Sequence, residues 1–249
     1  MDLDRLVSYL DEYLGVADYE DRSNNGLQVE GRREVRRVGY AVDACQEAFA
    51  EAAAKGVDLL VVHHGLYWGS PLMVTGVHRN RLLTLLQAGV SLYAAHLPLD
   101  AHPEVGNNAE MTRLLGLAPE TGFGYSGKRP IGQIAQAPAG TTLESLRQRL
   151  GEVLGSEAIS WPFREDVHRV AVVTGKATSL VYEALASGAD TLVFGELEHS
   201  VYHTAKEAGL GVVLGGHYRA ETLGLRALAR HLESTHGLES HWIEVPTGL

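Results

Sequence analysis

The stretch Val57-Asp-Leu-Leu-Val-Val-His-His-Gly65 decides the fold class of this chain. Four apolar residues in a row, Leu59 to Val62, follow an alanine-rich run that stops at Gly56. A short continuous apolar run of this kind is typical of a parallel strand that helices cover on both faces. The sequence therefore predicts an α/β protein.

Two adjacent histidines, His63 and His64, stand where this predicted strand ends. In open α/β sheets, ligands bind at the carboxyl ends of strands, so both imidazoles are candidates for a binding site. The alternative is that one histidine packs in the core and the other faces solvent. The stretch alone does not decide between the two interpretations.

The bulk composition is that of a globular protein with an acidic surface. The chain has 249 residues, 45% of them hydrophobic, which suits one large α/β domain or two small ones. A net charge of -10 disfavours non-specific binding of nucleic acid by the whole surface, though not by a local basic groove. A single cysteine, Cys45, excludes an intramolecular disulfide and a thiolate-based zinc site.

The start of the chain, Met1-Asp-Leu-Asp-Arg-Leu6, is too charged for a signal peptide. No apolar run approaches the roughly 18 residues of a membrane-spanning helix. We therefore expect a soluble, cytoplasmic protein that does not interact with membranes.

The first hundred residues alternate between helical and strand patterns. The predicted order is helix 3–14, turn-rich loop 21–31, strand 37–42, helix 46–55, strand 57–64, loop 66–76, helix 79–87 and strand 90–95. Such short spacing predicts parallel strands with right-handed crossovers. The loop 21–31 is either an ordinary surface loop or the border of a site.

Residues 103–167 have a different pattern, punctuated by proline and glycine. We expect a linker or small α/β segment with a helix at 111–115, a strand at 131–136 and a helix at 142–154. Gly122-Phe-Gly-Tyr-Ser-Gly127 matches the dinucleotide-binding pattern literally. It is rejected as such a site because no clear strand precedes it and no helix follows it.

The strand pattern then returns at a constant offset. Residues 169–173 match 37–41, and 188–194 match 56–62, so both matches are 132 residues apart (169 minus 37, 188 minus 56). A helix at 201–208 and a strand at 211–214 follow. His217 and Glu221 then mirror the spacing of His96 and Asp100. The match favours two related halves, although so few residues can also match by chance.

These patterns predict two similar α/β lobes, built mainly of parallel strands flanked by helices. The expected boundaries are a first lobe at 1–102 with His63, His64 and Asp100, a linker and small α/β segment at 103–167, and a second lobe at 168–249 with His217 and Glu221.

The polar residues at strand ends form one candidate set. Its members are His63, His64, His96, Asp100, His217, Glu221 and, less directly, Glu196. Imidazole and carboxylate together suit Zn, Fe, Mn, Co or Ni. Because adjacent strand residues splay apart, His63 and His64 cannot easily share one ion in a regular strand, but they could serve two neighbouring ions. The alternative is a scatter of separate hydrogen-bonded polar residues.

Glu221 follows His217 by about one helical turn, so the two side chains are expected on one face. Glu221 could then bridge two ions that together activate water, and it is the candidate catalytic residue. His96, Glu196 and His203 are candidates for roles behind the ligands or in proton transfer. Six further histidines are expected at the surface: His78, His102, His168, His231, His236 and His241.

Four motifs resemble the NIF-three-like family, also called domain of unknown function 34 and GTP cyclohydrolase 1 type 2 homologues. They are Asn24-Asn-Gly-Leu-Gln-Val29, Val62-His-His-Gly-Leu-Tyr-Trp68, Ala95-His-Leu-Pro-Leu-Asp100 and Gly215-Gly-His-Tyr-Arg-Ala-Glu221. The resemblance runs from about residue 3 to the C-terminus and is to the short bacterial form.

The resemblance implies an α/β fold of two similar lobes and a toroidal homohexamer. It also implies a dinuclear metal centre at His63, His64, Asp100, His217 and Glu221, with His96 nearby.

The leading functional hypothesis is a dinuclear-metal-dependent hydrolase of a small phosphorylated or nucleotide-like substrate, with GTP as a candidate. It requires two divalent ions per subunit, whose identity among Zn, Fe, Mn, Co and Ni is open. The alternatives are a non-catalytic metal-binding or metal-delivery scaffold, and a ring-shaped protein that binds protein or nucleic-acid partners.

Overall fold

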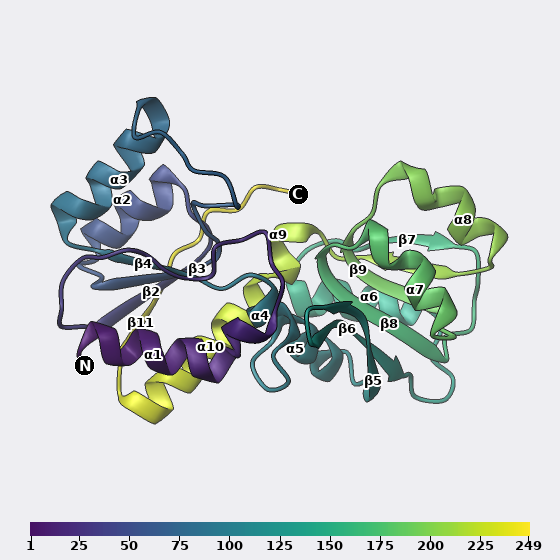
Figure 1. The fold of residues 1–249 in the computed structure, drawn as a ribbon. Helices are drawn as coiled ribbons and strands as arrows, with labels where there is room; N and C mark the ends of the chain where they lie inside the picture. Colours follow the sequence, from purple (N-terminus) through teal and green to yellow (C-terminus); the bar gives the residue numbers. More distant parts are fainter. The chain divides into compact units, whose positions relative to one another are not determined.

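The computed structural model describes residues 1–249, which divide into two compact units. Unit 1 comprises Met1–Leu99 and Gly224–Val245, and unit 2 comprises Asp100–Leu223 and Pro246–Leu249. Each unit has one sheet with helices on both faces (Figure 1). None of the helices combines the length and the apolar character that crossing a bilayer requires.

Unit 1 contains a five-stranded sheet of order β1-β4-β3-β2-β11. Its elements are α1 (Leu3–Leu14), η1 (Val16–Asp18), β1 (Gly26–Val29), β2 (Arg37–Asp43), α2 (Gln46–Ala54), β3 (Leu59–His64), α3 (Gly76–Ala88), β4 (Ser91–Ala94) and β11 (Glu239–Trp242). Two helices cross the unit boundary, α4 (Leu97–Ala101) and α10 (Thr222–His236). Strands β11, β2, β3 and β4 are parallel, and β1 is an antiparallel edge.

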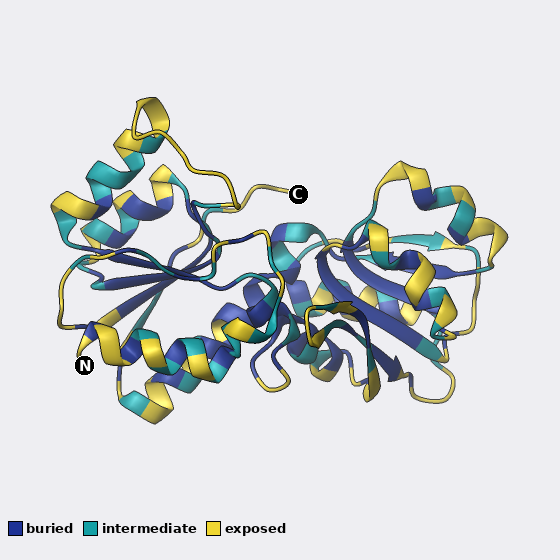
Figure 2. Cartoon of the chain, viewed as in Figure 1, coloured by how far each residue is buried: buried dark blue, intermediate teal, exposed yellow.

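Alternating faces of β3 build two apolar layers. Leu60 and Val62 pack with Phe49 of α2 and Leu85 of α3. On the other side lies α1, and Tyr93 of β4 donates a hydrogen bond of 2.8 Å to Asp11 of that helix. Figure 2 shows the strands buried and the outward faces of these helices exposed. This double cover explains the continuous apolar run in the sequence.

Unit 2 contains a six-stranded sheet of order β5-β6-β8-β9-β10-β7. Its elements are α5 (Asn107–Leu114), β5 (Ala118–Ser126), β6 (Arg129–Gln136), α6 (Leu143–Leu154), β7 (Ile159–Pro162), β8 (Arg169–Lys176), η2 (Thr178–Leu180), α7 (Val181–Ala186), β9 (Thr191–Glu196), η3 (His199–Val201), α8 (Tyr202–Glu207), β10 (Gly211–Leu214) and α9 (His217–Ala220). Apolar residues of α5 and α6 pack on one face, and those of α7 and α8 on the other.

Two observations differ from the expected layout. Residues 103–167 are part of unit 2, because β6 pairs with β8 and β7 pairs with β10 in its sheet. Near the C-terminus, β11 instead joins unit 1 by pairing with β2. The glycine pattern at 122–127 lies in the antiparallel β5–β6 hairpin, and no helix follows it. This agrees with its rejection as a dinucleotide-binding site.

The sequence repeat is a structural repeat. Val38 pairs with Leu59 in unit 1, and Val170 pairs with Thr191 in unit 2, so the parallel register is shifted by the same 132 residues in both strands. The strand orders β2-β3-β4 and β8-β9-β10 also agree. The predicted pair of similar α/β lobes is therefore confirmed.

The repeat extends to a side-chain contact that fixes the start of the first strand. Asp58 accepts hydrogen bonds from the backbone N–H groups of Arg36 and Arg37, both at 3.0 Å. Asp190, its counterpart, accepts from those of His168 and Arg169 at 3.2 and 3.1 Å. Each carboxylate thus accepts hydrogen bonds from backbone N–H groups at the start of a strand.

We expect Asp58→Ala and Asp190→Ala each to lower the free energy of unfolding by about 1 to 3 kcal/mol, because each removes a charged acceptor from two backbone donors. Urea titration followed by circular dichroism measures the change. Asp166→Ala, at an exposed position, is the control and should change stability by less than about 0.5 kcal/mol. A similar small effect in all three variants would contradict a structural role for the repeated contact.

Candidate functional site

The carboxyl ends of β3 and β4 bring three histidines of unit 1 together. His63 is fully buried and His64 is partly exposed at the end of β3, and His96 follows β4. Their ring centroids lie 4.7 Å apart for His63 and His64, and 5.1 Å apart for His63 and His96. One ring nitrogen of each lies within 4.8 Å of the others, so the three can hold a metal ion.

Each of the three imidazoles is oriented through its Nδ1 atom. His63 Nδ1 lies 2.9 Å from the carbonyl oxygen of Ala95, and His64 Nδ1 lies 2.9 Å from Asp43 Oδ1. His96 Nδ1 lies 3.0 Å from Asp21 Oδ1. Because a carbonyl or carboxylate oxygen only accepts, each Nδ1 must donate. The lone pair of a neutral ring is then on Nε2, which is the arrangement typical of metal-binding histidines.

Asp21 is the most strongly held of these orienting groups. It accepts from the backbone N–H groups of Ser23 and Leu97, at 3.0 and 3.1 Å, and from the Asn25 side chain at 2.9 Å. Burial by itself raises the pKa of Asp21, but the hydrogen bond and electrostatic attraction of His96, together with the hydrogen bonds from Asn25 and Ser23, lower that pKa to about 2. The turn-rich loop 21–31 therefore borders the histidine cluster.

A second group of polar residues lies in unit 2, where the chain leaves β10. His217 opens α9, and its Nε2 lies 3.1 Å from Glu221 Oε1. Its Nδ1 lies 3.5 Å from Glu196 Oε2. Asp100 and Glu221 are buried, with 4% and 2% exposure, and their carboxylate oxygens lie within 4.8 Å of each other. His217 and Glu221 thus share one face, as their spacing predicts.

Asp100 is fixed through one of its two oxygens. Asn107 Nδ2 and Thr174 Oγ1 both donate to Asp100 Oδ1, at 2.9 and 3.0 Å. The neighbouring Asn108 accepts from the backbone N–H of Thr174 at 2.7 Å and donates to the carbonyl oxygen of Ile131 at 2.7 Å. Asn108 thus connects α5 to β6 and β8, and Asp100 is held by neighbouring residues of α5 and β8.

Several predicted roles look different in the structure. His96, predicted as a possible supporting residue, lies in one group with His63 and His64 that could hold a metal ion. His203 is exposed on α8, where its ring meets Tyr202 edge-on. The expectation that His102 lies at the surface is wrong, since it is 7% exposed and its Nδ1 accepts from the N–H groups of Glu104 and Val105.

The other five histidines of the surface group are mixed. His168 is exposed, whereas the remaining four are partly buried: His78, His231, His236 and His241. His231 stacks on Tyr13 at 4.1 Å between ring centroids. Packing against aromatic rings thus buries part of the imidazole, which sequence spacing does not reveal.

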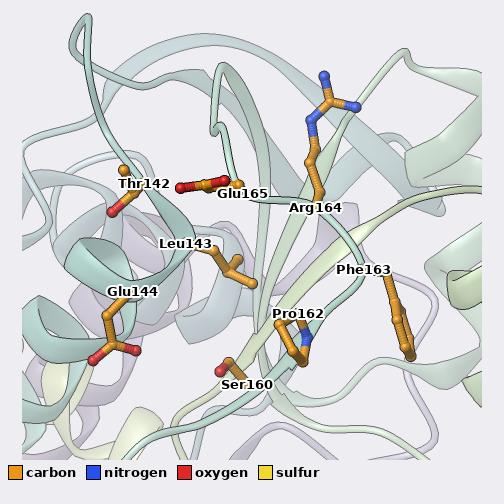
Figure 3. A pocket seen from close by; sticks show the side chains of 8 residues that line it. All are labelled: Thr142, Leu143, Glu144, Ser160, Pro162, Phe163, Arg164 and Glu165. Atoms are coloured by element: carbon orange, nitrogen blue, oxygen red, sulfur yellow. The ribbon is translucent and has the colours of Figure 1, made fainter.

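Unit 2 also has a cavity of about 490 Å³ at the first turn of α6 (Figure 3). Glu165 points toward Thr142 there, and Arg164 points away from the other lining side chains. Thr142 already caps α6 by accepting from the backbone N–H of Ser145 at 3.1 Å. The lining contains no histidine, so this cavity lacks the mixed donor set of the two polar groups.

Comparison with known proteins gives the family. The model of the Duf34/NIF3 (NGG1p interacting factor 3) family matches residues 1–247. The chain belongs to the Duf34/NIF3 family. Two relatives named GTP cyclohydrolase 1 type 2 homolog are similar along their length. The one from Deinococcus radiodurans is 42% identical over 99% of this chain and 94% of its own, and the one from Pyrococcus abyssi is 43% identical over 100% of both.

A solved structure of this Duf34/NIF3 fold is also similar. The crystal structure of TTHA1606 from Thermus thermophilus superposes with a TM-score of 0.90, at 45% identity and with 100% of both chains covered. The likeness confirms the family resemblance of the four sequence motifs and the α/β fold.

We expect Asp21→Asn to weaken binding of Co²⁺ or Zn²⁺ by about 10- to 100-fold, because a charged acceptor for His96 Nδ1 is lost. Competition with a chromophoric chelator measures the affinity. Glu30→Gln, an exposed change in the same loop region, should leave the affinity unaltered. Equal affinity of the Asp21→Asn and unaltered proteins would remove Asp21 from the metal-binding group.

Gly175→Ala should displace Glu221. Gly175 has φ +68°, and a Cβ there would collide with Glu221 Oε1. Gly209→Ala is a matched control, since Gly209 has φ +64° and open space around it. Both changes carry backbone strain of about 1 to 2 kcal/mol. Only Gly175→Ala should also lower metal affinity, by about tenfold or more, in the chelator competition. Equal metal affinities in the two variants would remove Glu221 from the proposed metal ligands.

Proposed function

We propose that this Duf34/NIF3 protein is a dinuclear-metal-dependent hydrolase of a small phosphorylated or nucleotide-like substrate. In this proposal His63, His64 and His96 of unit 1 and Asp100, His217 and Glu221 of unit 2 bind the same two divalent ions. The observation that carries it is the pair of buried carboxylates, Asp100 and Glu221, whose oxygens lie within 4.8 Å. Two buried carboxylates at this separation repel each other unless a cation or a shared proton compensates.

Chain connectivity supports a shared site. Asp100 lies on the short helix α4, which begins one residue after His96. At a rise of about 1.5 Å per residue, four helical residues span about 6 Å. The last histidine of the first group and the first carboxylate of the second are therefore tethered at a distance that suits ligands of neighbouring ions.

The donors fit the proposed ions. Neutral imidazoles with fixed Nδ1 protons, together with carboxylates, suit Zn, Fe, Mn, Co or Ni. Such ions supply Lewis acidity, which polarises a substrate oxygen and makes a water molecule more acidic at neutral pH. Glu221 has two oxygens and is the residue that we propose to contact both ions.

The protein's own groups would orient the metal-binding histidines and transfer protons near the ions. Asp21, Asp43 and the carbonyl oxygen of Ala95 keep the Nδ1 protons of the three histidines in place. Glu196 faces His217 Nδ1 at 3.5 Å and is 42% exposed, so it can both orient that ring and exchange a proton with solvent or substrate.

The substrate class follows from the names of the relatives. Proteins 42% and 43% identical to this chain are named GTP cyclohydrolase 1 type 2 homologs, so GTP is the first substrate to test. The ring-shaped homohexamer stays a prediction from the family resemblance.

We expect Glu221→Gln to lower the metal content and to reduce any hydrolysis of GTP by about 10²-fold or more, because the negative charge that this carboxylate would contribute beside the two dications is removed. Metal content is measured by mass spectrometry after dialysis, and turnover by product chromatography. Glu207→Gln, an exposed change on α8, is the control and should retain both.

Two outcomes would contradict the proposal in different ways. Full turnover with two bound ions in Glu221→Gln would remove Glu221 from the mechanism. Metal binding and rapid metal exchange with no turnover of GTP or of a panel of phosphate esters would favour the metal-delivery scaffold instead.

A further inference from the structure

Unit 2 has a second cavity, of about 500 Å³, at the carboxyl ends of β9 and β10. All of its lining residues belong to unit 2. Leu214 at the end of β10 pairs with Ile159 at the start of the antiparallel strand β7, so both lie at the same edge of the sheet. A crevice at this edge is where open α/β sheets bind ligands, and the volume is that of a small-molecule site.

The wall of this cavity is largely apolar. Ile159 and Leu249 line it with 61% and 75% of their surface exposed, and Leu197 and Leu214 line it as partly buried residues. Large apolar side chains gathered around a concave site leave surface that a ligand can cover. The cavity therefore favours a ligand with an apolar body.

The charged groups on the lining are mainly acceptors. Glu157 and Glu196 both line the cavity, with Arg219 as the one cation among its lining residues. The nearby Arg147 is held by Glu144 at 2.6 Å and by the carbonyl oxygen of Ala158 at 3.2 Å. Ionised carboxylates only accept hydrogen bonds, so a matching ligand must carry N–H or O–H donors.

The position of the cavity relates it to the proposed metal centre. Gly216, Tyr218 and Arg219 line it, and these residues flank His217 in the sequence. Glu196, another lining residue, faces His217 Nδ1 at 3.5 Å. A ligand in the cavity therefore lies beside a proposed metal ligand.

We infer that this cavity binds the organic part of the substrate, and that this part is an N–H-bearing heterocycle of the aminopurine kind. The apolar wall covers the ring, and the carboxylates of Glu157 and Glu196 accept from its N–H groups. This inference rests on the proposed function, because it assigns the substrate class of the proposed metal centre.

Guanosine and inosine are the probes, since they differ only by the exocyclic amino group of guanine. Isothermal titration of the full-length protein, both metal-free and Zn²⁺-loaded, should show guanosine binding about tenfold more tightly, the scale of one hydrogen bond to a charged acceptor. Glu157→Gln should reduce the preference for guanosine over inosine to between about onefold and threefold, while leaving metal content unchanged.

Ile159→Trp fills the cavity from an exposed position and should weaken both nucleosides by about tenfold or more. Tyr182→Trp, at an exposed position on α7, is the matched control and should bind like the unaltered protein. Equal binding of the two nucleosides, no binding of either, or an unaltered affinity in Ile159→Trp would each overturn the inference.

The two proposals fail separately in this experiment. Nucleoside binding as expected, in a protein that does not take up two ions when Zn²⁺ is added, would retain the cavity and reject the dinuclear hydrolase. Two bound ions with GTP turnover, but with no effect of Ile159→Trp on either nucleoside, would retain the hydrolase and reject the cavity.

Discussion

The hydrogen bond between His63 Nδ1 and the carbonyl oxygen of Ala95 couples the candidate site to the sheet. It joins the end of β3 to the residue that follows the neighbouring strand β4, at 2.9 Å. A buried imidazole needs a partner for its N–H group, and this carbonyl supplies it. Because Ala95 N–H in turn donates to Val62 at 2.9 Å, the ring is held at a position set by the parallel register. A slip of β3 against β4 would lose the ring orientation and the core together.

The internal repeat has preserved the amino ends of the strands and changed the carboxyl ends. Asp58 and Asp190 make the same contacts with the preceding backbone in the two units. At the other end, His64 lies beside Asp43 in unit 1, whereas Glu196 lies beside Lys176 in unit 2. The amino ends carry the structural requirement that both sheets share. The carboxyl ends carry the polar side chains. Because these side chains differ between the units, the two similar sheets present different donor groups.

The sequence was sufficient to predict the central strands and to select the polar residues that gather in the two groups. Long apolar runs and a constant offset reveal buried parallel strands, because burial on both faces leaves little choice of residue. It was insufficient for β1, β5 and β11, whose short or exposed pairings depend on partners distant in the chain. Asp43 could have been found by the strand-end rule that found His63, since it ends β2. Asp21 could not, because 75 residues separate it from His96 and no spacing pattern connects them.

Charge balance is the strongest physical reason to expect cations here. Asp100 and Glu221 are buried side by side, and the three histidines of unit 1 direct their Nδ1 atoms to oxygens that only accept. If the groups served only to stabilise the fold, apolar residues of similar size would do so without the cost of burying charge. Protonation of the carboxylates would relieve the repulsion but would not explain why all three histidines are oriented through Nδ1. The proposed divalent ions would account for both observations, since they would compensate the carboxylates and use the Nε2 lone pairs that the Nδ1 hydrogen bonds leave available.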